Sequence, residues 1–264
     1  MLAPAGRTTL AALGFLLLGC AQPAPAPPRT LVVAVTDATQ AAAERVASLA
    51  RERIPGLVLR LRPGNTASAL AALRRGDAAV ALVDGEVDAS PDLTVIALGE
   101  EPVAIIVNPA NPIANASREL LAQLYSGRLQ DWSEVGGPPG PIILLTREEG
   151  DGARTAFERI VLQGRTVTGR ARLAPSERLM VQQVAALAGA IGYVGLGAVD
   201  ARVKVVPLDM KRPGADSTYP LLRPVLLVTV ARAESDVQAL IQLAASEAGR
   251  AALQGEEENR SPAR

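Results

Sequence analysis

The sequence predicts an α/β fold with mostly parallel sheets. After Arg29, short β-rich runs alternate with helical patterns, and this order produces parallel strands covered by helices. The chain is 48% hydrophobic but only 2% aromatic, so its core has to be built mainly from Val, Leu, Ile and Ala. With 264 residues, it is long enough for one or two domains with sizeable cores.

The expected elements follow one another at short intervals. Two helices have clear start signals: Asp37 with Gln40 three residues later reads as a capping box, and Ser176 reads as an N-cap. In chain order we expect a strand over 31–35, a helix over 37–53, a strand over 57–62, a helix over 64–75, strands over 78–83, 93–98 and 103–107, a helix over 117–125, a strand over 142–146, helices over 152–162 and 176–188, strands over 190–194, 203–206 and 224–230, and a final amphipathic helix over 235–254.

The stretch Arg147–Phe157, "REEGDGARTAF", is the most informative part of the chain. A strand ends at Arg147, and a glycine loop then opens a helix at Gly152. Backbone N–H groups at a helix N-terminus beside an arginine suit an anion. Asp151, however, places a carboxylate where that anion would bind. The loop therefore predicts an anion pocket, a modified one, or one that is filled by the chain itself.

The composition argues against several classes of function. There is no histidine and only one cysteine, Cys20, so His-based metal sites, Ser-His-Asp triads and internal disulfides are excluded. Lys+Arg 27 against Asp+Glu 27 gives a net charge of zero, which does not favour nucleic acid. We expect no enzyme activity and no cofactor.

The N-terminus reads as an export signal. Arg7 supplies positive charge, Leu10–Leu18 is an apolar run too short to span a membrane, and Gly19 precedes Cys20. This pattern resembles a bacterial lipoprotein signal over 1–19, in which Cys20 carries the lipid. The alternative is an ordinary cleaved signal with an incidental cysteine. Residues 20–29 then form a Pro/Ala-rich tether, and the charged tail 256–264 is expected to be disordered.

Several ordered segments resemble the phosphate-binding proteins of ABC importers. The longest, 108–137, reads "NPANPIANASRELLAQLYSGRLQDWSEVGG", and "GAIGYVGL" from Gly189, "YPLLRPVLLV" from Tyr219 and "SEAGRAAL" from Ser246 follow in the family's order. The resemblance covers roughly residues 31–254. We interpret Trp132 and Tyr193 in these segments as packing residues rather than ligand contacts.

The resemblance implies a two-lobed, periplasmic-binding-protein-like (type II) fold with a ligand cleft between the lobes, which close on the ligand. Carried over, the first lobe comprises residues 30–102 plus 204–255 and the second lobe 103–203. The chain would cross between the lobes near Gly99–Val103 and Asp200–Val205.

The resemblance also implies a set of ligand contacts. Asp84 matches the family aspartate that accepts a hydrogen bond from a protonated phosphate oxygen and so excludes sulfate, and Arg147 matches the phosphate-binding arginine. Gly152 matches a glycine whose N–H faces the anion, and Arg154 matches an arginine behind the site. The complete set of expected ligand-binding residues is Thr36, Asp37, Asn65, Thr66, Asp84, Arg147, Asp151, Gly152 and Ala153.

Two positions depart from the family pattern. The family's Ser-Gly-Thr reads Asp151-Gly152-Ala153, and its first Gly-Ser-Thr-like loop reads Val35-Thr36-Asp37. Two like charges ~4 Å apart repel by roughly 4 kcal/mol at an effective dielectric of about 20, which corresponds to about a thousandfold in affinity. Phosphate binding therefore requires Asp37 and Asp151 to turn away, pair with arginine or be protonated.

Each site residue also has a structural interpretation. Asp37 and Asp151 lie at helix starts, where aspartate is a good N-cap. Arg147 could pair with Glu148 or Glu149, and Asp84 could be a buried, hydrogen-bonded loop residue. For Asp151 the structural interpretation itself affects function, because a carboxylate that caps its own helix uses the N–H groups that an external anion needs.

From these observations we expect a monomeric, lipid-anchored protein of the cell envelope, outside the cytoplasm. It would bind inorganic phosphate or a related oxyanion and deliver it to an ABC permease. The alternative is a binding-protein-like lipoprotein with an altered or degenerate site, for a cationic, zwitterionic or other solute, a hard cation, or for sensing or scaffolding.

Overall fold

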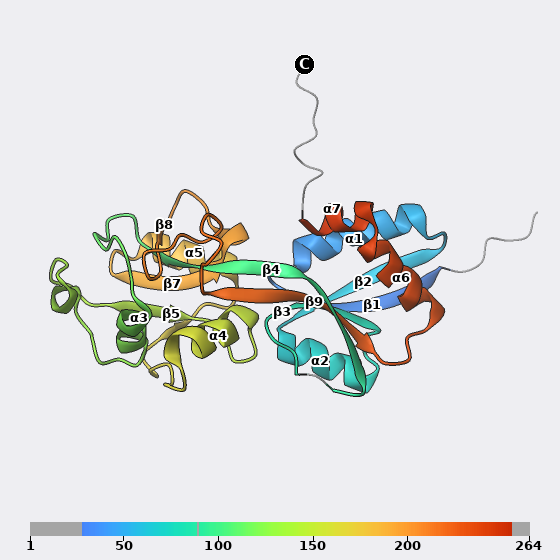
Figure 1. Cartoon of the computed structure of the whole chain (residues 1–264), viewed down its shortest axis with the longest axis horizontal. Coiled ribbons are helices and arrows are strands. Elements are labelled where there is room, and N and C mark those ends of the chain that lie inside the picture. The colour runs from blue at the N-terminus through green and yellow to red at the C-terminus, as the bar shows by residue number, and fades with distance from the viewer. Residues whose placement is uncertain (1–27, 89, 255–264) are drawn as a thin grey trace, which may run out of the picture.

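The computed structural model describes residues 28–88 and 90–254, which form two lobes joined by two chain crossings (Figure 1). Strand β4 (Leu93–Val107) runs from the first lobe into the second. Strand β9 (Leu222–Val230) pairs antiparallel with its first part, from Leu93 to Pro102. One mixed sheet with the order β2-β1-β3-β9-β4-β7-β5-β6 thus extends through the described part of the molecule, with β8 also paired to β4. The two-lobed α/β fold expected from the sequence is confirmed.

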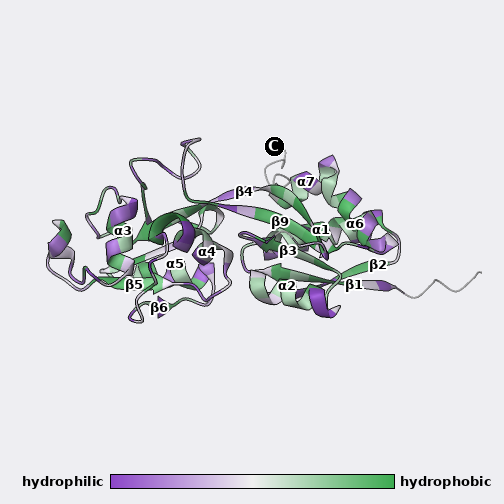
Figure 2. Cartoon of the chain, turned by 60° about the horizontal axis from the view of Figure 1, so that its bottom comes forward, coloured by the Kyte–Doolittle hydropathy of each residue, from purple (hydrophilic) through white to green (hydrophobic). Residues whose placement is uncertain are grey.

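The first lobe is a five-strand layer with helices on both faces. It contains β1 (Arg29–Thr36), β2 (Leu57–Gly64) and β3 (Val80–Asp84) beside β9 and β4, and its helices are α1 (Gln40–Arg53), α2 (Thr66–Arg75), α6 (Ser235–Ala245) and α7 (Glu247–Gln254). Side chains alternate along β1: Val33 and Val35 pack in the cluster that includes α1 and α6, whereas Ala34 packs with α2. Figure 2 shows hydrophobic strands between helices that carry both polar and apolar residues.

The second lobe is built around the end of β4. It contains α3 (Arg118–Tyr125), a 3-10 turn (Trp132–Val135), β5 (Ile143–Thr146), α4 (Gly152–Phe157) continued by a π-helical turn (Glu158–Leu162), β6 (Arg172–Leu173), α5 (Glu177–Ala186), β7 (Ala190–Gly195), a 3-10 turn (Leu196–Ala198) and β8 (Lys204–Val206). All five aromatic residues of the described chain lie in its largest core cluster: Tyr125, Trp132, Phe157, Tyr193 and Tyr219. The interpretation of Trp132 and Tyr193 as packing residues is confirmed.

Several predicted element boundaries need correction. The expected strands over 93–98 and 103–107 are one strand, β4, with a bulge between Ala97 and Gly99. The final helix is broken at Ser246, and β6 was not anticipated. The capping box at Asp37 is wrong: α1 begins at Gln40, and Asp37 bonds elsewhere.

The predicted return from the second lobe also needs correction. Strand β8 pairs with Ile105–Val107 of β4, and Val206, Leu208, Tyr219 and Leu221 belong to the second-lobe core. Residues 204–221 are therefore part of the second lobe, and the chain returns through Leu222–Pro224 rather than near Asp200–Val205. The first crossing lies within Gly99–Val103, as expected, because β4 changes pairing partners from β9 to β7 there.

The predicted signal over 1–19, Cys20, most of the tether and the tail over 256–264 lie outside the described residues. Arg29, at the end of the expected tether, is the first residue of β1. Among residues 28–88 and 90–254, no helix is both long and apolar enough to span a membrane.

Candidate functional site

The loops at the carboxyl ends of four strands meet between the lobes. Asp37 follows β1, Asn65 follows β2, Asp84 ends β3 and Arg147 follows β5. The first three loops belong to the first lobe and the last to the second. Ligands of open α/β sheets bind beyond the carboxyl ends of strands, so this junction is the candidate site.

Arg147 is bound to a carboxylate of its own loop. The side chain is only 3% exposed; its Nε donates to Asp151 Oδ2 at 2.9 Å, and its Nη2 lies 2.8 Å from the same oxygen. Its Nη1 donates to the Ala174 carbonyl at 3.0 Å. The predicted partners Glu148 and Glu149 are therefore wrong, and the ion pair is with Asp151.

Asp151 also caps helix α4. Its Oδ1 accepts the Arg154 backbone N–H at 3.0 Å, which confirms the interpretation of Asp151 as an N-cap. One carboxylate thus takes both the guanidinium and the helix N–H that the sequence predicted for an external oxyanion. Ala153, in the same turn, is fully buried in the second-lobe core.

Asp84 is buried and has partners on both oxygens. Its Oδ1 accepts the Thr36 hydroxyl at 2.5 Å, and its Oδ2 accepts Arg223 Nη1 at 2.8 Å. The Thr66 hydroxyl donates to the Asp84 backbone carbonyl at 2.5 Å. Burial raises the pKa of Asp84 above its ordinary value, while the nearby Arg223 opposes that rise. Thr36, Thr66 and Asp84 are thus brought together, as predicted.

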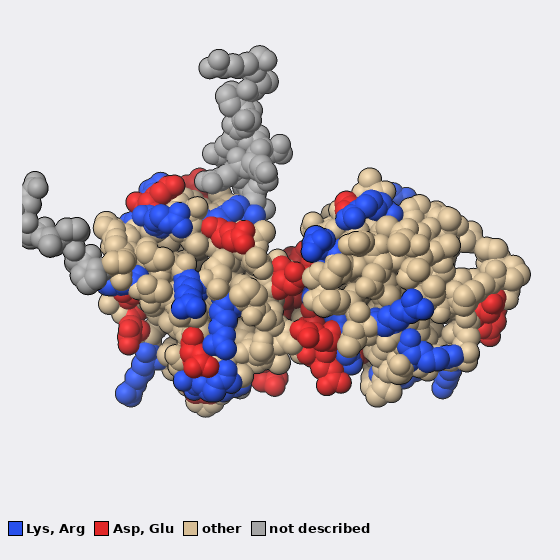
Figure 3. Space-filling model, turned by 180° about the vertical axis from the view of Figure 1, so that it is seen from behind, with Lys and Arg blue, Asp and Glu red and all other residues tan. Residues whose placement is uncertain are grey.

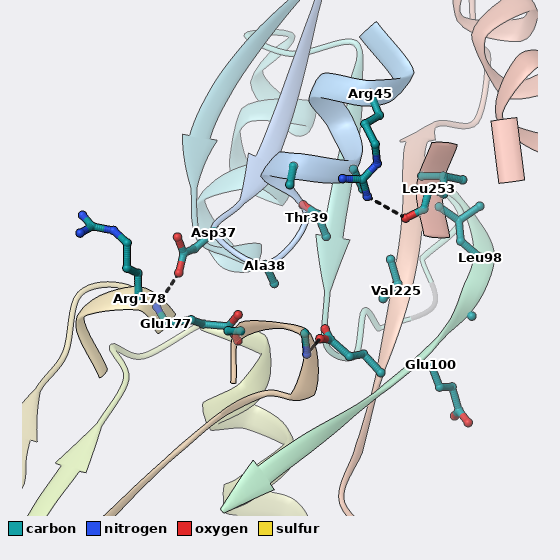
Figure 4. Close-up of a pocket in the computed structure, with 16 residues that line it drawn as sticks. Asp37, Ala38, Thr39, Arg45, Leu98, Glu100, Glu177, Arg178, Val225 and Leu253 are labelled. Atoms are coloured by element: carbon teal, nitrogen blue, oxygen red, sulfur yellow. Dashed lines mark hydrogen bonds between the residues drawn. The ribbon is translucent and has the colours of Figure 1, made fainter. Parts of the chain in front are cut away.

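Asp37 connects the first lobe to the second. Its Oδ2 accepts the backbone N–H of Glu177, the first residue of α5, at 2.6 Å, and Figure 4 shows the carboxylate directed at that helix. The same oxygen lies 3.6 Å from Arg147 Nη2. Asp37 therefore binds a helix N-terminus, but that of α5 rather than that of its own helix.

The two lobes touch beside these residues. Asn65 caps α2, and its Nδ2 donates to Glu148 Oε1 at 3.0 Å and to the Glu149 carbonyl at 3.2 Å. A Cβ added at Gly152 would lie 2.3 Å from Asp84 Oδ2. Glycine is required at this close approach, and an ion between Gly152 and Asp84 would require the lobes to separate.

A family comparison agrees with this architecture. The family model described as a PBP superfamily domain matches residues 21–248. The chain belongs to the PBP superfamily.

Relatives in this superfamily include proteins named for phosphate. The chain is 23% identical to the phosphate-binding protein PstS of Bacillus subtilis over 202 residues, which is 73% of this chain and 67% of that protein. A crystal structure of an ABC-type phosphate transport receptor from Vibrio cholerae has a TM-score of 0.75 at 24% identity, covering 86% of this chain and 98% of that one. A putative phosphate ABC transporter substrate-binding protein from Clostridium perfringens, with bound phosphate, has a TM-score of 0.78 at 20% identity and the same coverage. The structural similarities establish the PBP fold.

Arg223, a buried arginine of the cleft, was not among the site residues predicted from the sequence. Its side chain is 1% exposed, and besides Asp84 it binds Glu101 Oε2 through Nη2 at 2.6 Å and Glu177 Oε1 through Nη2 at 2.8 Å. The available signal was an arginine inside the apolar run "YPLLRPVLLV". A charged residue in such a run is buried and paired more often than not, because burying it alone is costly.

The cleft is rich in carboxylates. Arg147 pairs with Asp37 and Asp151, and Arg223 pairs with Asp84, Glu101 and Glu177, so five carboxylates face two guanidinium groups. Figure 3 shows acidic side chains gathered where the lobes meet. Burial raises the pKa of Glu177, and Arg223 again opposes the rise. An incoming anion would meet a net negative charge.

Two cavities adjoin these residues. One of about 730 Å³ lies between α1, β4 and α5, and its lining includes Asp37, Glu101 and Glu177 (Figure 4). A smaller one of about 140 Å³ is lined by Thr66, Asp84 and Gly152, among others. Arg147 lines neither. Within the described ranges, no three Asp, Glu, Cys or His side chains are grouped so as to hold a metal ion, and Asp37, Asp84 and Asp151 each have other partners.

Proposed function

We propose that this chain is an extracytoplasmic solute-binding protein for phosphate or a related oxyanion that serves an ABC permease, without catalysis. The proposal is supported by membership of the PBP superfamily and by the relatives named as phosphate-binding proteins. The observation that carries it is the pairing of Arg147 with Asp151: the guanidinium and helix N–H that the family resemblance implies for phosphate already bind a carboxylate, that of Asp151.

Phosphate would bind where the Asp151 carboxylate now lies. It would take the Arg147 guanidinium, a strong bidentate partner for oxyanions, and the N–H groups at the start of α4. Asp84, already held by Thr36, would accept a hydrogen bond from a protonated phosphate oxygen. Because Asp151 has to leave and the lobes have to part, we expect weak binding, with Kd in the millimolar range.

A thermal melt of the chain from Pro28 onward tests this proposal, since every described element lies in that range. With a Kd of about 1 mM, 10 mM phosphate stabilises the folded state by about 1.4 kcal/mol, which raises Tm by roughly 3–6 °C. Sulfate at equal ionic strength is the control, because Asp84 would repel an oxyanion that has no proton to donate. Equal shifts for the two anions, or no shift with phosphate, would argue against the proposal.

The second candidate is a binding-protein-like lipoprotein with an altered site. It is favoured by the polar groups of the cleft, since every buried side-chain nitrogen and oxygen in the described part has a hydrogen-bond partner. Under this alternative, phosphate would not shift Tm even when Asp151 is replaced.

The lipid anchor at Cys20 is a separate part of the proposal and rests on the sequence pattern Leu17-Leu18-Gly19-Cys20. Two or more acyl chains would hold the protein firmly at the membrane. Cells that express the full chain should incorporate labelled fatty acid into it, and Cys20→Ala should abolish the label. Labelling that persists in the variant would contradict the anchor.

A further inference from the structure

One buried arginine binds carboxylates of both lobes. Arg223 lies where the chain crosses back into the first lobe, with its side chain 1% exposed. Nη1 lies 2.8 Å from Asp84 of the first lobe, and Nη2 lies 2.8 Å from Glu177 of the second. A single guanidinium thus binds a carboxylate of each lobe.

The other ion pair at the lobe junction with a similarly short distance is solvated. Arg159 Nε and Glu86 Oε1 are 3.0 Å apart, but the two side chains are 46% and 51% exposed. Exposed pairs contribute little, whereas removing one partner of a buried pair is strongly unfavourable. The link through Arg223 is therefore stronger than the Arg159–Glu86 pair.

Glu177, rather than Glu101, makes this link span the lobes. Glu101 is directly opposite Arg223 in the β4–β9 register, so that pair lies within the crossing itself. Glu177 begins α5, and its Oε1 also accepts the Gly195 backbone N–H of β7 at 2.8 Å. Its carboxylate is thus anchored to the second lobe while it binds Arg223.

We propose that Arg223, by binding Asp84 of the first lobe and Glu177 of the second, latches the two lobes closed. A solute enters only when Glu177 leaves Arg223. The latch holds whichever solute the cleft takes, so it stands or falls independently of phosphate binding.

Spin labels can measure the latch directly. The chain from Pro28 onward has no cysteine, because Cys20 is the only one. Cysteines at exposed Glu52 of α1 and exposed Gln182 of α5 place one label on each lobe. Pulsed electron–electron distance measurements are made without phosphate on the labelled parent, on Glu177→Ala, and on Glu101→Ala as the matched control, since it also removes a carboxylate from Arg223.

We expect one distance in the labelled parent and in Glu101→Ala, and a second, different distance in Glu177→Ala. Loss of one carboxylate from the buried Arg223 guanidinium predicts a closed-to-open ratio lowered by about 10- to 100-fold. A parent distribution in Glu177→Ala, two populations in the parent, or equal opening in Glu101→Ala would overturn the latch. Should Glu177→Ala not fold by circular dichroism, Arg223→Lys decides, because one ammonium cannot present the same fork: a closed distribution in that variant overturns the proposal.

Discussion

At the residue scale, only some of the charged residues in the cleft could be predicted from the sequence. Arg147, Asp84 and Asp151 were identifiable because each follows a predicted strand or opens a predicted helix. Their partners were not, because Arg223 lies 139 positions from Asp84 and Glu177 lies 140 positions from Asp37. Local patterns carry no information about such pairings, which arise only when distant segments meet in the folded chain.

Glu177 should make stability depend on pH. Burial raises its pKa, so the folded chain keeps this proton to a higher pH than the unfolded chain does. The stability that this group contributes is full below its unfolded pKa and is lost as pH rises through the folded value. Glutamine does not titrate, so Glu177→Gln does not lose this stability as pH rises. The Tm of Glu177→Gln minus the Tm of the parent should therefore be larger at pH 8 than at pH 4.

Glu158→Gln is a control for this pH series, because Glu158 pairs with Arg154 on the same helix and its side chain is 39% exposed. Its Tm difference from the parent should change less between the two pH values. A Tm difference between Glu177→Gln and the parent that stays constant or shrinks with rising pH would contradict the raised pKa of Glu177.

At the element scale, the sequence predicted the identity of most strands and helices but misplaced their joins. The sequence predicted two strands, over 93–98 and 103–107, yet β9 pairs from Leu93 to Pro102 and keeps β4 continuous across its bulge. The Asp37–Gln40 spacing predicted a capping box, yet the Asp37 carboxylate accepts the backbone N–H of Glu177 at the start of α5 instead. In both cases a long-range contact overrode a local signal.

The aromatic residues allow one lobe to be tested alone. Phe157 is fully buried, and its ring stacks on Tyr193 with centroids 4.3 Å apart and contacts Tyr125. Phe157→Ala should lower the unfolding free energy of the second lobe by about 3–5 kcal/mol, through lost burial and the cavity left behind. Trp132, the only tryptophan, is buried in the same core, so its fluorescence reports on that lobe. A denaturation midpoint by fluorescence that matches the parent would contradict this account of the core.

At the scale of the whole molecule, the lobes are closed through contacts of the chain itself: the Arg223 link, the Asp37–Glu177 hydrogen bond and the contact of Gly152 with Asp84. The sequence predicted the two lobes through family resemblance, but not that the cleft would close in this way. The steric fit between the lobes depends on the surfaces of both, so it cannot be predicted from the sequence of either lobe alone.

Gly152→Ala should open the lobes by steric contact alone. The added Cβ would lie 2.3–2.5 Å from Asp84 atoms, two of them in the backbone, which cannot move aside as a flexible side chain can. The Glu52–Gln182 label pair should therefore show a new distance. Gly140→Ala is the matched control in the same lobe, because nothing lies within 4 Å of its added Cβ. An unchanged distance in Gly152→Ala would show that the lobes do not rest on this contact.

The central claim is that the Asp151 carboxylate occupies the oxyanion site, and calorimetric titration of phosphate into Asp151→Ser tests it most directly. Serine keeps an N-cap for α4, whereas adding Ala153→Thr would put a hydroxyl into the apolar core. Asp131→Ser, which replaces another capping aspartate of the second lobe, is the control. Removing up to about 4 kcal/mol of repulsion predicts a phosphate affinity for Asp151→Ser that is about 10- to 1000-fold above the parent, with Asp131→Ser unchanged. An affinity for Asp151→Ser equal to that of the parent would contradict the claim.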